Sequence, residues 1–324
     1  RFGADQGGRA MNFAAMMVVA LVIDLAFGWP DALYKRIGHP VTWIGALIAR
    51  LEKGWNFKGR LRRLRGVLAA LAVIGTTVVI ALAVQLWLPA GWPGVLIGGV
   101  LAWPFVALRS MHDHVAAVAK PLSAGDLPGA RQAVSMIVGR DPSQLDQPGV
   151  ARAALESLAE NSSDGIVAPL FWGCVAGLPG IAGYKAINTL DSMIGHRTDR
   201  YEEFGWASAR IDDLVNLIPA RLTGLFFVLA APCRGRALAV MQSDARSHRS
   251  PNAGWPEAAM AGALAIRLSG PRIYADRVAE EPWLNGTAPD PTPADLARGL
   301  ALYRRAMAGM ALAIGLVALL WSLS

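Results

Sequence analysis

Residues 66–88 read GVLAALAVIGTTVVIALAVQLWL, an uninterrupted run without a charged side chain. At the rise of an α-helix, a stretch of this length crosses the hydrocarbon core of a bilayer with some tilt. The run therefore predicts a transmembrane helix. The chain around it is predicted to be an all-α, polytopic integral membrane protein with re-entrant or broken helices and a polar layer on the cytoplasmic side.

The composition of the whole chain agrees with this fold class. Of the 324 residues, 54% are hydrophobic and 17% are charged, whereas globular domains carry about a quarter charged residues. The net charge of +7 comes from basic residues in loops, which favours anionic lipid headgroups and phosphorylated substrates over nucleic acid as partners. Cys174 and Cys233 have neither a disulfide-framework nor a metal-ligand spacing. The polar residues 1–10 are interpreted as an extension or remnant, and residues 11–324 as one polytopic domain.

Further apolar stretches predict the remaining membrane segments. Residues 12–29, 93–108 and 306–322 are expected to span the membrane. Residues 164–183 are interrupted by prolines and glycines, and residues 214–231 begin with polar side chains. Such stretches are typical of re-entrant or discontinuous helices, so each of these two segments is expected either to re-enter or to span.

Basic residues set the expected orientation of the chain. Residues 50–65 are rich in Lys and Arg, and the positive-inside rule places this loop in the cytoplasm. Residues 109–163 and 232–305 are placed on the same side for the same reason. The chain is therefore expected in the bacterial cytoplasmic (inner) membrane, with its active site toward the cytoplasm. Residues 164–231 must then cross an even number of times or not at all, and the sequence leaves both open.

The stretch ESLAENSSDGIVAP holds the first cluster of polar residues. Glu156 and Glu160 are four apart on a helical face, Asn161 follows, and the turn-forming SSDG is expected to bring Asp164 back beside them. Oxygen ligands of this kind suit Mg²⁺, which binds one or two carboxylates and keeps other positions for water and phosphate. The alternative is a helix end followed by a capped turn.

The stretch GYKAINTLDSMIGHRTDR holds the second cluster. Asn188 and Asp191 are three apart on a predicted helix, and a flexible glycine precedes His196 and Arg197. Arginines bind phosphate oxygens in pairs. Lys185, Arg197 and, further on, Arg210 are therefore candidates to neutralise phosphates, whereas the acids that follow Arg197 are interpreted as a solvated face.

The stretch IDDLVNLIPARLTG holds the third cluster. Asp212 and Asp213 lie four and three residues before Asn216, so these side chains are expected to share a helical face. Pro219 is expected to break that helix, with Arg221 directly after the break. Charges at membrane depth are a functional-site hypothesis by default, and a structural acid–arginine pair is the alternative.

The amino-terminal stretch DLAFGWPDALYKRIGHPVTWIGALI is the fourth cluster, and it adds His39 as a weaker candidate. His248 has no supporting motif of its own. The chain contains neither G-x-x-x-x-G-K-[ST] nor G-x-G-x-x-G. Any ATP must therefore be held by carboxylate-bound Mg²⁺ and by Arg or Lys on helices.

Six blocks in order over nearly the whole chain resemble one family, the adenosylcobinamide-phosphate synthases of cobalamin biosynthesis, known as CbiB or CobD. The blocks are DLAFGWP, HPVTWIGALI, ENSSDGIVAPLFW, YKAINTLDSMIGHR, FGWASARIDDLVNLIPARLTG and SDARSHRSPNAGWPEAAMAGAL. The resemblance implies a membrane enzyme that joins adenosylcobyric acid to (R)-1-amino-2-propanol O-phosphate and consumes ATP with Mg²⁺. It also implies channelling of the product to the later membrane-bound cobalamin synthase.

The resemblance supports a set of site residues more than individual roles. The expected metal ligands are Glu160, Asn161, Asp164, Asp191, Asp212, Asp213 and Asn216. The expected phosphate-binding residues are Lys185, Arg197, Arg210, Arg221 and His39. His196 is the candidate for proton transfer or a phosphate contact, and Asp191, Arg197 and Asp212 complete the expected catalytic group.

Two other functions fit parts of the pattern. An ion-coupled transporter also places acids, an arginine and broken helices at membrane depth, but it needs no cytoplasmic layer of acids and phosphate-binding cations. A Mg-dependent membrane prenyltransferase uses acidic motifs, which DDLVN loosely resembles, and it would repeat that motif on a second helix. The sequence does not decide between the phosphorylated and the free amino alcohol as nucleophile.

Overall fold

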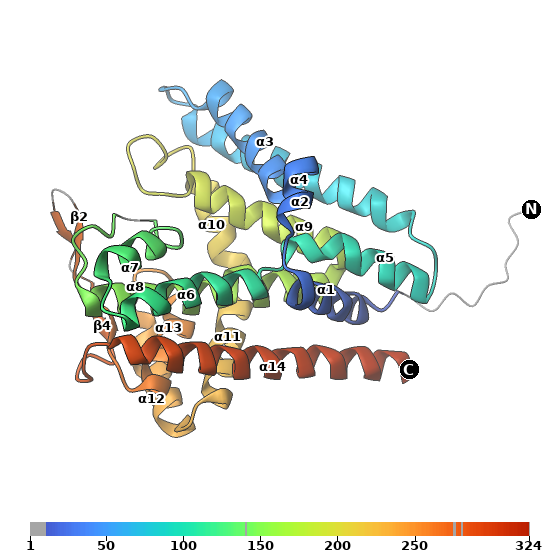
Figure 1. Ribbon diagram of the computed structural model, residues 1–324. Helices are drawn as coiled ribbons and strands as arrows, with labels where there is room; N and C mark the ends of the chain where they lie inside the picture. Colours follow the sequence, from blue (N-terminus) through green and yellow to red (C-terminus); the bar gives the residue numbers. More distant parts are fainter. Residues whose placement is uncertain (1–10, 140, 275–276, 280, 324) are drawn as a thin grey trace, which may run out of the picture. The chain divides into compact units, whose positions relative to one another are not determined.

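The computed structural model describes residues 11–139, 141–274, 277–279 and 281–323. It is almost entirely helical, which confirms the predicted all-α fold (Figure 1). The strands of the described residues form two small antiparallel pairs, β1 with β4 and β2 with β3. The predicted extension at residues 1–10 lies outside the described residues.

The chain forms two compact units that alternate along the sequence. Unit 1 comprises Arg1–Val106, Pro169–Asp212 and Ala311–Ser324, and unit 2 comprises Ala107–Ala168 and Asp213–Met310. Each unit therefore combines segments that are far apart in the sequence.

Unit 1 is built around a helical core. Its elements are α1 (Phe13–Phe27), α2 (Asp31–Ile37), α3 (Pro40–Trp55), α4 (Arg62–Leu86), α5 (Trp92–Ala102), the 3₁₀-helix η1 (Trp103–Phe105), most of α9 (Ala168–Ile194) and most of α10 (Trp206–Val215). Ile48 of α3, Val73 of α4 and Leu190 of α9 are almost fully buried against one another and against Phe204. The first and last parts of the unit also meet, because the Asn12 side-chain amide donates to the Ala318 carbonyl at 2.8 Å.

Glycines allow close backbone approach within unit 1. A Cβ atom at Gly66 of α4 would lie 1.9 Å from the Phe204 carbonyl oxygen, whereas one at Gly75 on the same helix would meet nothing within 4 Å. A Cβ atom at Gly98 of α5 would lie 2.3 Å from the sulfur of Met16 in α1. Small residues at such contacts bring membrane helices together without a side chain between them.

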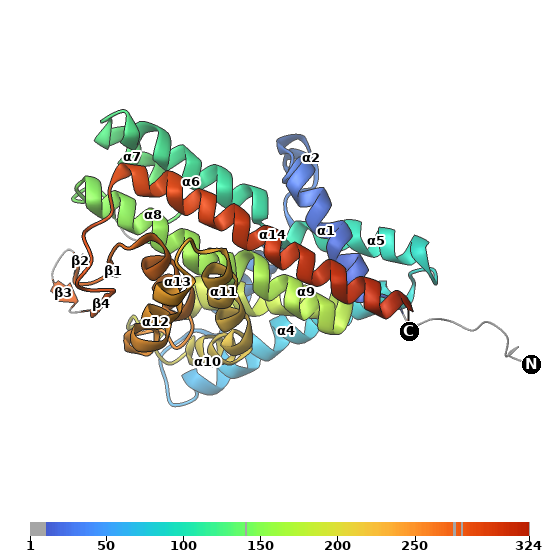
Figure 2. The ribbon, with the colours of Figure 1, turned by 90° about the horizontal axis from the view of Figure 1, so that it is seen from below.

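Unit 2 surrounds a buried central helix. Its elements are α6 (Leu108–Ser123), α7 (Leu127–Val134), α8 (Gln147–Ser162), the π-helix η2 (Ser163–Val167), α11 (Leu217–Ala230), α12 (Arg234–Asp244), the 3₁₀-helix η3 (Ala245–Ser247), α13 (Gly254–Leu264), β1 (Leu268–Ser269), β2 (Arg272–Tyr274), β3 (Arg277–Ala279), β4 (Trp283–Leu284) and the first half of α14 (Pro293–Leu323). Helix α13 packs against α8, α11 and α12 (Figure 2). It is buried on all sides, as expected for a helix that is apolar around its whole circumference.

Four helical stretches of the described chain are long and apolar enough to cross a membrane. They are Arg62–Leu86, Trp92–Ser123, Gln147–Ile194 and Pro293–Leu323. Two bent pairs pass the same test together, with breaks of 112° between α1 and the helices after it and 48° between α10 and α11. The described residues thus offer four to six candidate spans, and each predicted membrane segment falls on one of them.

Two prolines lie at helix boundaries. The predicted span over residues 93–108 falls within the candidate span Trp92–Ser123, although α5 itself ends at Ala102, because Pro104 cannot donate a backbone hydrogen bond and restricts the residue before it. One local expectation is wrong. Pro219 does not break its helix, since it lies within the first turn of α11, where the backbone N–H groups have no helical partner. The break lies at Asn216 instead, where α10 and α11 meet with a bend of 48°.

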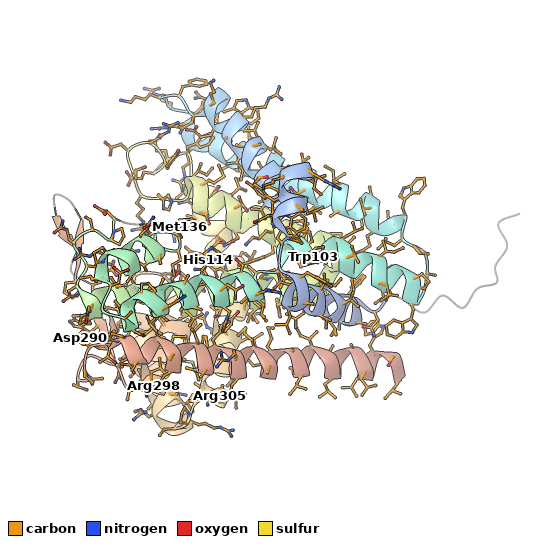
Figure 3. All side chains as sticks on the ribbon, viewed as in Figure 1. Trp103, His114, Met136, Asp290, Arg298 and Arg305 are labelled. Atoms are coloured by element: carbon orange, nitrogen blue, oxygen red, sulfur yellow. The ribbon has the colours of Figure 1, made fainter. Side chains whose placement is uncertain are left out.

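The segment between α13 and α14 is fixed to α8 by a shared acid. Arg267 binds Asp290 with two hydrogen bonds of 2.9 and 2.6 Å, and Arg152 of α8 binds the same carboxylate. Both guanidinium groups also lie over the Trp283 ring. Their Cζ atoms are 4.6 Å (Arg152) and 4.2 Å (Arg267) from the ring centroid. Figure 3 labels Asp290 before the start of α14. Arg267 and Arg152 hold the pKa of Asp290 below its ordinary value.

We expect Asp290→Asn to lower the free energy of unfolding at neutral pH by about 1 kcal/mol, a figure that allows for the partial exposure of the carboxylate to solvent. Because the folded pKa is lowered, the charged Asp290 stabilises the fold above its unfolded pKa of about 3.9. This contribution is lost as the pH falls through the lower, folded pKa. Thermal unfolding of the two proteins should therefore differ at pH 7 and converge in acid. A difference that is independent of pH would show that the charge of Asp290 is not what stabilises this contact.

Candidate functional site

The predicted turn at SSDG is a π-helix, and this corrects the sequence interpretation. Residues Ser163–Val167 continue α8 directly into α9. Pro169 has no N–H to offer the Gly165 carbonyl one helical turn earlier, and the backbone N–H of Ala107 binds that carbonyl instead, at 3.1 Å. π-Helical turns within α-helices occur frequently at functional sites.

Side chains on the last turns of α8 bond back to the helix before the π-helix begins. The Asn161 amide donates to the Ser157 carbonyl at 2.9 Å, and the Ser162 hydroxyl donates to the Leu158 carbonyl at 2.6 Å. Such bonds compete with the regular helical ladder and bend helices. Asn161 thus presents its amide to its own helix, whereas Glu160 is exposed and Asp164 is half-buried on the π-helix.

The π-helix packs against α11, which brings two predicted clusters together in unit 2. One carries Glu160, Asn161 and Asp164, and the other begins at the buried Asn216 and includes Arg221. The Arg221 side chain donates to the Leu217 carbonyl at 2.7 Å and lies 4.4 Å from the Trp255 ring centroid.

A buried histidine–glutamate pair lies in the same unit. His248 Nε2 is 3.7 Å from Glu257 Oε2, and their side chains are only 4% and 2% exposed. The Asn252 amide donates to the Asp213 carbonyl at 2.7 Å, which ties this loop to the third cluster. Sequence reasoning left Glu257 and Asn252 out of the site. The available signal was an acid inside the otherwise apolar stretch PEAAMAGAL.

Two predicted phosphate-binding residues, His39 and Lys185, both belong to unit 1. The charge of Lys185 acts on the His39 ring, and the Lys185 amine donates to the Asn188 side chain at 3.1 Å. His39 caps α3, with its Nδ1 accepting from the Val41 N–H at 3.2 Å. A neutral ring therefore carries its proton on Nε2, where it can donate to an anion.

Aromatic rings frame His39. Its ring lies edge-on to Trp29, with ring centroids 4.8 Å apart, and Trp29 lies 5.1 Å from Trp103, which Figure 3 labels. The Trp103 indole N–H donates to the Gly28 carbonyl at 3.0 Å and fixes this arrangement. No motif in the sequence indicated that Trp29 lies against His39, with Trp103 behind it.

The end of α9 holds the other candidates of unit 1. A Cβ atom at Gly195 would lie 2.0 Å from Asp191 Oδ1, so this glycine leaves room for the carboxylate. The His196 ring is 2.9 Å from the Ser192 carbonyl, through Nε2. Arg197 and Arg210 are exposed.

The predicted metal ligands are distributed over both units. Asp191 and Asp212 belong to unit 1, and the remaining five belong to unit 2. Among the described residues, no group of three or more His, Cys, Asp or Glu side chains is arranged to hold a metal ion. Mg²⁺ needs only one or two protein carboxylates when phosphate oxygens supply other ligands, so its binding here stays a prediction.

An open hollow on unit 1 contains none of the predicted site residues in its lining. It is lined by Lys58, Arg60, Arg62, Asp199 and Glu202, among others. Because its lining contains both basic and acidic side chains, the hollow indicates no particular class of ligand. We therefore locate the candidate site by the chemistry of the clusters above rather than by this hollow.

Comparison with known proteins identifies close relatives. Residues 17–303 match the family described as CobD/Cbib protein. A Rhodobacter capsulatus protein named Cobalamin biosynthesis protein CobD is 94% identical over 97% of this chain and 100% of its own length. Proteins of the same name from Sinorhizobium sp and Brucella suis are 48% and 46% identical, over 93% and 94% of this chain and 98% and 97% of their own lengths. No solved structure matches the chain.

Proposed function

The chain belongs to the CobD/CbiB protein family, and we propose that it acts in cobalamin biosynthesis as an ATP-dependent amide ligase. Its substrates in this proposal are adenosylcobyric acid and (R)-1-amino-2-propanol O-phosphate, and its product is adenosylcobinamide phosphate. The observation that carries the proposal is similarity over nearly the full chain to proteins named for cobalamin biosynthesis.

The chemistry explains why the site needs both acids and cations. A carboxylate is a poor acyl donor because its charge repels a nucleophile and oxide is not a usable leaving group. In the proposed reaction, a carboxylate oxygen of the corrinoid attacks the γ-phosphorus of ATP, and ADP leaves. The amine then attacks the acyl carbon of the resulting acyl phosphate, inorganic phosphate leaves, and a base takes the ammonium proton.

Residues of both units suit parts of this reaction. Lys185 and His39 of unit 1 offer a cation and an N–H donor for phosphate oxygens, and the charge of Lys185 acts on the His39 ring. Bound Mg²⁺ would neutralise charge on the triphosphate, with Asp164 as its first ligand candidate in unit 2 and Asp191 in unit 1. His196 stays the candidate for moving the ammonium proton.

The location of the reaction is part of the proposal. The basic residues of the 50–65 segment favour a cytoplasmic position for this end of α4 by the positive-inside rule, and ATP is available on that side. A bacterial inner-membrane location would allow the product to pass to the membrane-bound cobalamin synthase. In a variant without its natural cysteines, Lys58→Cys should react with a membrane-impermeant maleimide only after the cells are opened. Labelling in intact cells would reverse the proposed orientation.

The test of the reaction uses protein purified in detergent with ATP, Mg²⁺, adenosylcobyric acid and the aminopropanol phosphate. We expect adenosylcobinamide phosphate and ADP in equal amounts, and no amide when either ATP or the amine is omitted. Amide without ATP consumption, or ATP consumption without amide, would contradict the proposal. ATP-independent flux of substrate into liposomes would support a transporter instead.

A further inference from the structure

Two arginines of unit 2 lie on elements that pack against the start of one helix. Arg221 lies on α11, Arg246 lies on η3, and Trp255 lies on α13. A Cβ atom at Gly254 would lie 2.2 Å from the Ala245 carbonyl oxygen of η3, and one at Gly224 of α11 would lie 3.0 Å from the Trp255 carbonyl oxygen. The Arg221 guanidinium lies 4.4 Å from the centroid of the Trp255 ring, and the charge of Arg246 acts on it. Three separate elements thus converge on one corner.

Arg221 and Arg246 differ in their ion pairs from three other arginines of the unit. Arg249 pairs with Glu281 at 3.1 Å, Arg267 pairs with Asp290 at 2.6 Å, and Arg298 pairs with Asp295. Within the described part of the chain, neither Arg221 nor Arg246 forms an ion pair with a carboxylate. Two like charges that repel each other are stabilised when an anion binds between them.

The corner is held in position by its own hydrogen bonds. The Trp255 indole N–H donates to the Pro251 carbonyl at 3.2 Å, which fixes the ring. Arg221 uses Nη1 for the Leu217 carbonyl, and its guanidinium carries further N–H groups that remain as donors. Arg246 is exposed, so a small solute reaches it.

We infer that Arg221, Arg246 and Trp255 form a binding site for a phosphate monoester that carries no metal. A monoester dianion matches two guanidinium groups in charge and accepts several hydrogen bonds. A metal-bound triphosphate would need carboxylates beside the phosphates, and among the described residues no ion pair joins a carboxylate to either arginine.

The inference assigns this corner to the phosphate of aminopropanol phosphate, and in this respect it rests on the proposed function. It adds Arg246 and Trp255 to the residues expected to bind substrate. It also separates the two phosphate-bearing substrates, because ATP would be held where acids for Mg²⁺ are present. The phosphorylated amino alcohol, rather than the free one, would then be the nucleophile.

Calorimetric titration of aminopropanol phosphate into the purified full chain tests the site. We expect Arg246→Gln to weaken binding about 10-fold to 100-fold, the equivalent of one lost charge-assisted contact. The KM for ATP should change less than about 2-fold, because the ATP phosphates bind elsewhere. Inorganic phosphate should compete in the wild type, and free 1-amino-2-propanol should bind both proteins equally weakly.

Arg234→Gln is the matched control, because Arg234 is an exposed arginine at the start of α12 in the same unit and loses the same charge. It should bind like the wild type. Arg246→Lys should restore part of the affinity, since it returns the charge without the planar fork. Thermal unfolding of each variant checks that it is folded.

Several results would overturn the inference. One is that Arg246→Gln binds aminopropanol phosphate as tightly as the wild type, and another is that its KM for ATP rises as much as its affinity for aminopropanol phosphate falls. A third is that Arg234→Gln loses as much affinity as Arg246→Gln. Competition by short-chain phosphatidylglycerol but not by inorganic phosphate would indicate a lipid headgroup site. The outcomes also separate the two proposals. If the wild type forms the amide and Arg246→Gln binds aminopropanol phosphate normally, only the proposed phosphate site is wrong. If binding of aminopropanol phosphate depends on Arg246 but the wild type forms no amide, only the proposed ligase activity is wrong.

Discussion

Asp164→Asn is expected to lower kcat/KM for amide formation by at least about 100-fold. Mutation of a residue that only hydrogen-bonds to a metal ligand already lowers metal affinity or activity by about 10-fold to 100-fold, and loss of a ligand itself should cost more. Asparagine keeps the shape of the side chain and removes the charge that a cation needs. The π-helix itself is set by the backbone around Pro169, so it should persist. Steady-state kinetics across a range of Mg²⁺ concentrations measure the effect, and excess Mg²⁺ should restore part of the activity.

Asp199→Asn is the matched control for this experiment. Asp199 is exposed in unit 1, and its replacement removes the same charge from a face interpreted as solvated. It should leave kcat/KM within about 2-fold of the wild type, as is usual for surface changes away from a site. If Asp164→Asn were as active as this control, Asp164 would not be a metal ligand.

Gly66→Ala is expected to destabilise unit 1 severely, by about 3 kcal/mol or more. The added methyl group would lie 1.9 Å from the Phe204 carbonyl oxygen. That atom belongs to the backbone, so no rotation of a side chain relieves the contact. The yield of monodisperse protein in detergent and its thermal unfolding midpoint should both fall.

Gly75→Ala provides the comparison on the same helix. A Cβ atom there meets nothing within 4 Å, and alanine is the better helix former by up to about 1 kcal/mol. Its unfolding midpoint should equal or slightly exceed that of the wild type. Equal behaviour of the two variants would mean that α4 does not pack closely against Phe204.

Much of the fold could be predicted from the sequence because a bilayer imposes strong rules. The apolar run at residues 66–88 lies largely within α4 (Arg62–Leu86), since spanning length and lack of charge leave few alternatives. The prolines and glycines of residues 164–183 correctly indicated a discontinuous helix, and α9 has non-helical geometry at Gly177. Gln85 of α4 satisfies the backbone there by accepting from the Leu178 N–H at 2.7 Å.

Features set by tertiary contacts could not be predicted in the same way. The SSDG composition suggests a turn, but the Ala107 N–H supplies the partner that Pro169 removes, and a π-helix results. The break at Asn216 replaces the one expected at Pro219, because proline is tolerated in the first turn of a helix. The pairing of His248 with Glu257 depends on a contact that only the folded chain makes.

The interleaving of the two units also constrains how the protein is made. Unit 1 takes segments from both ends of the sequence, and the hydrogen bond from Asn12 to Ala318 joins those ends. A nascent chain can form this bond only after residue 318 has left the ribosome, although Asn12 emerged hundreds of residues earlier. Unit 2 draws all its segments from positions before residue 311, so its full set of residues is synthesised first. The early helices of unit 1 must therefore wait for their last partner, and unit 1 is completed only after the segment around Ala318 has been synthesised.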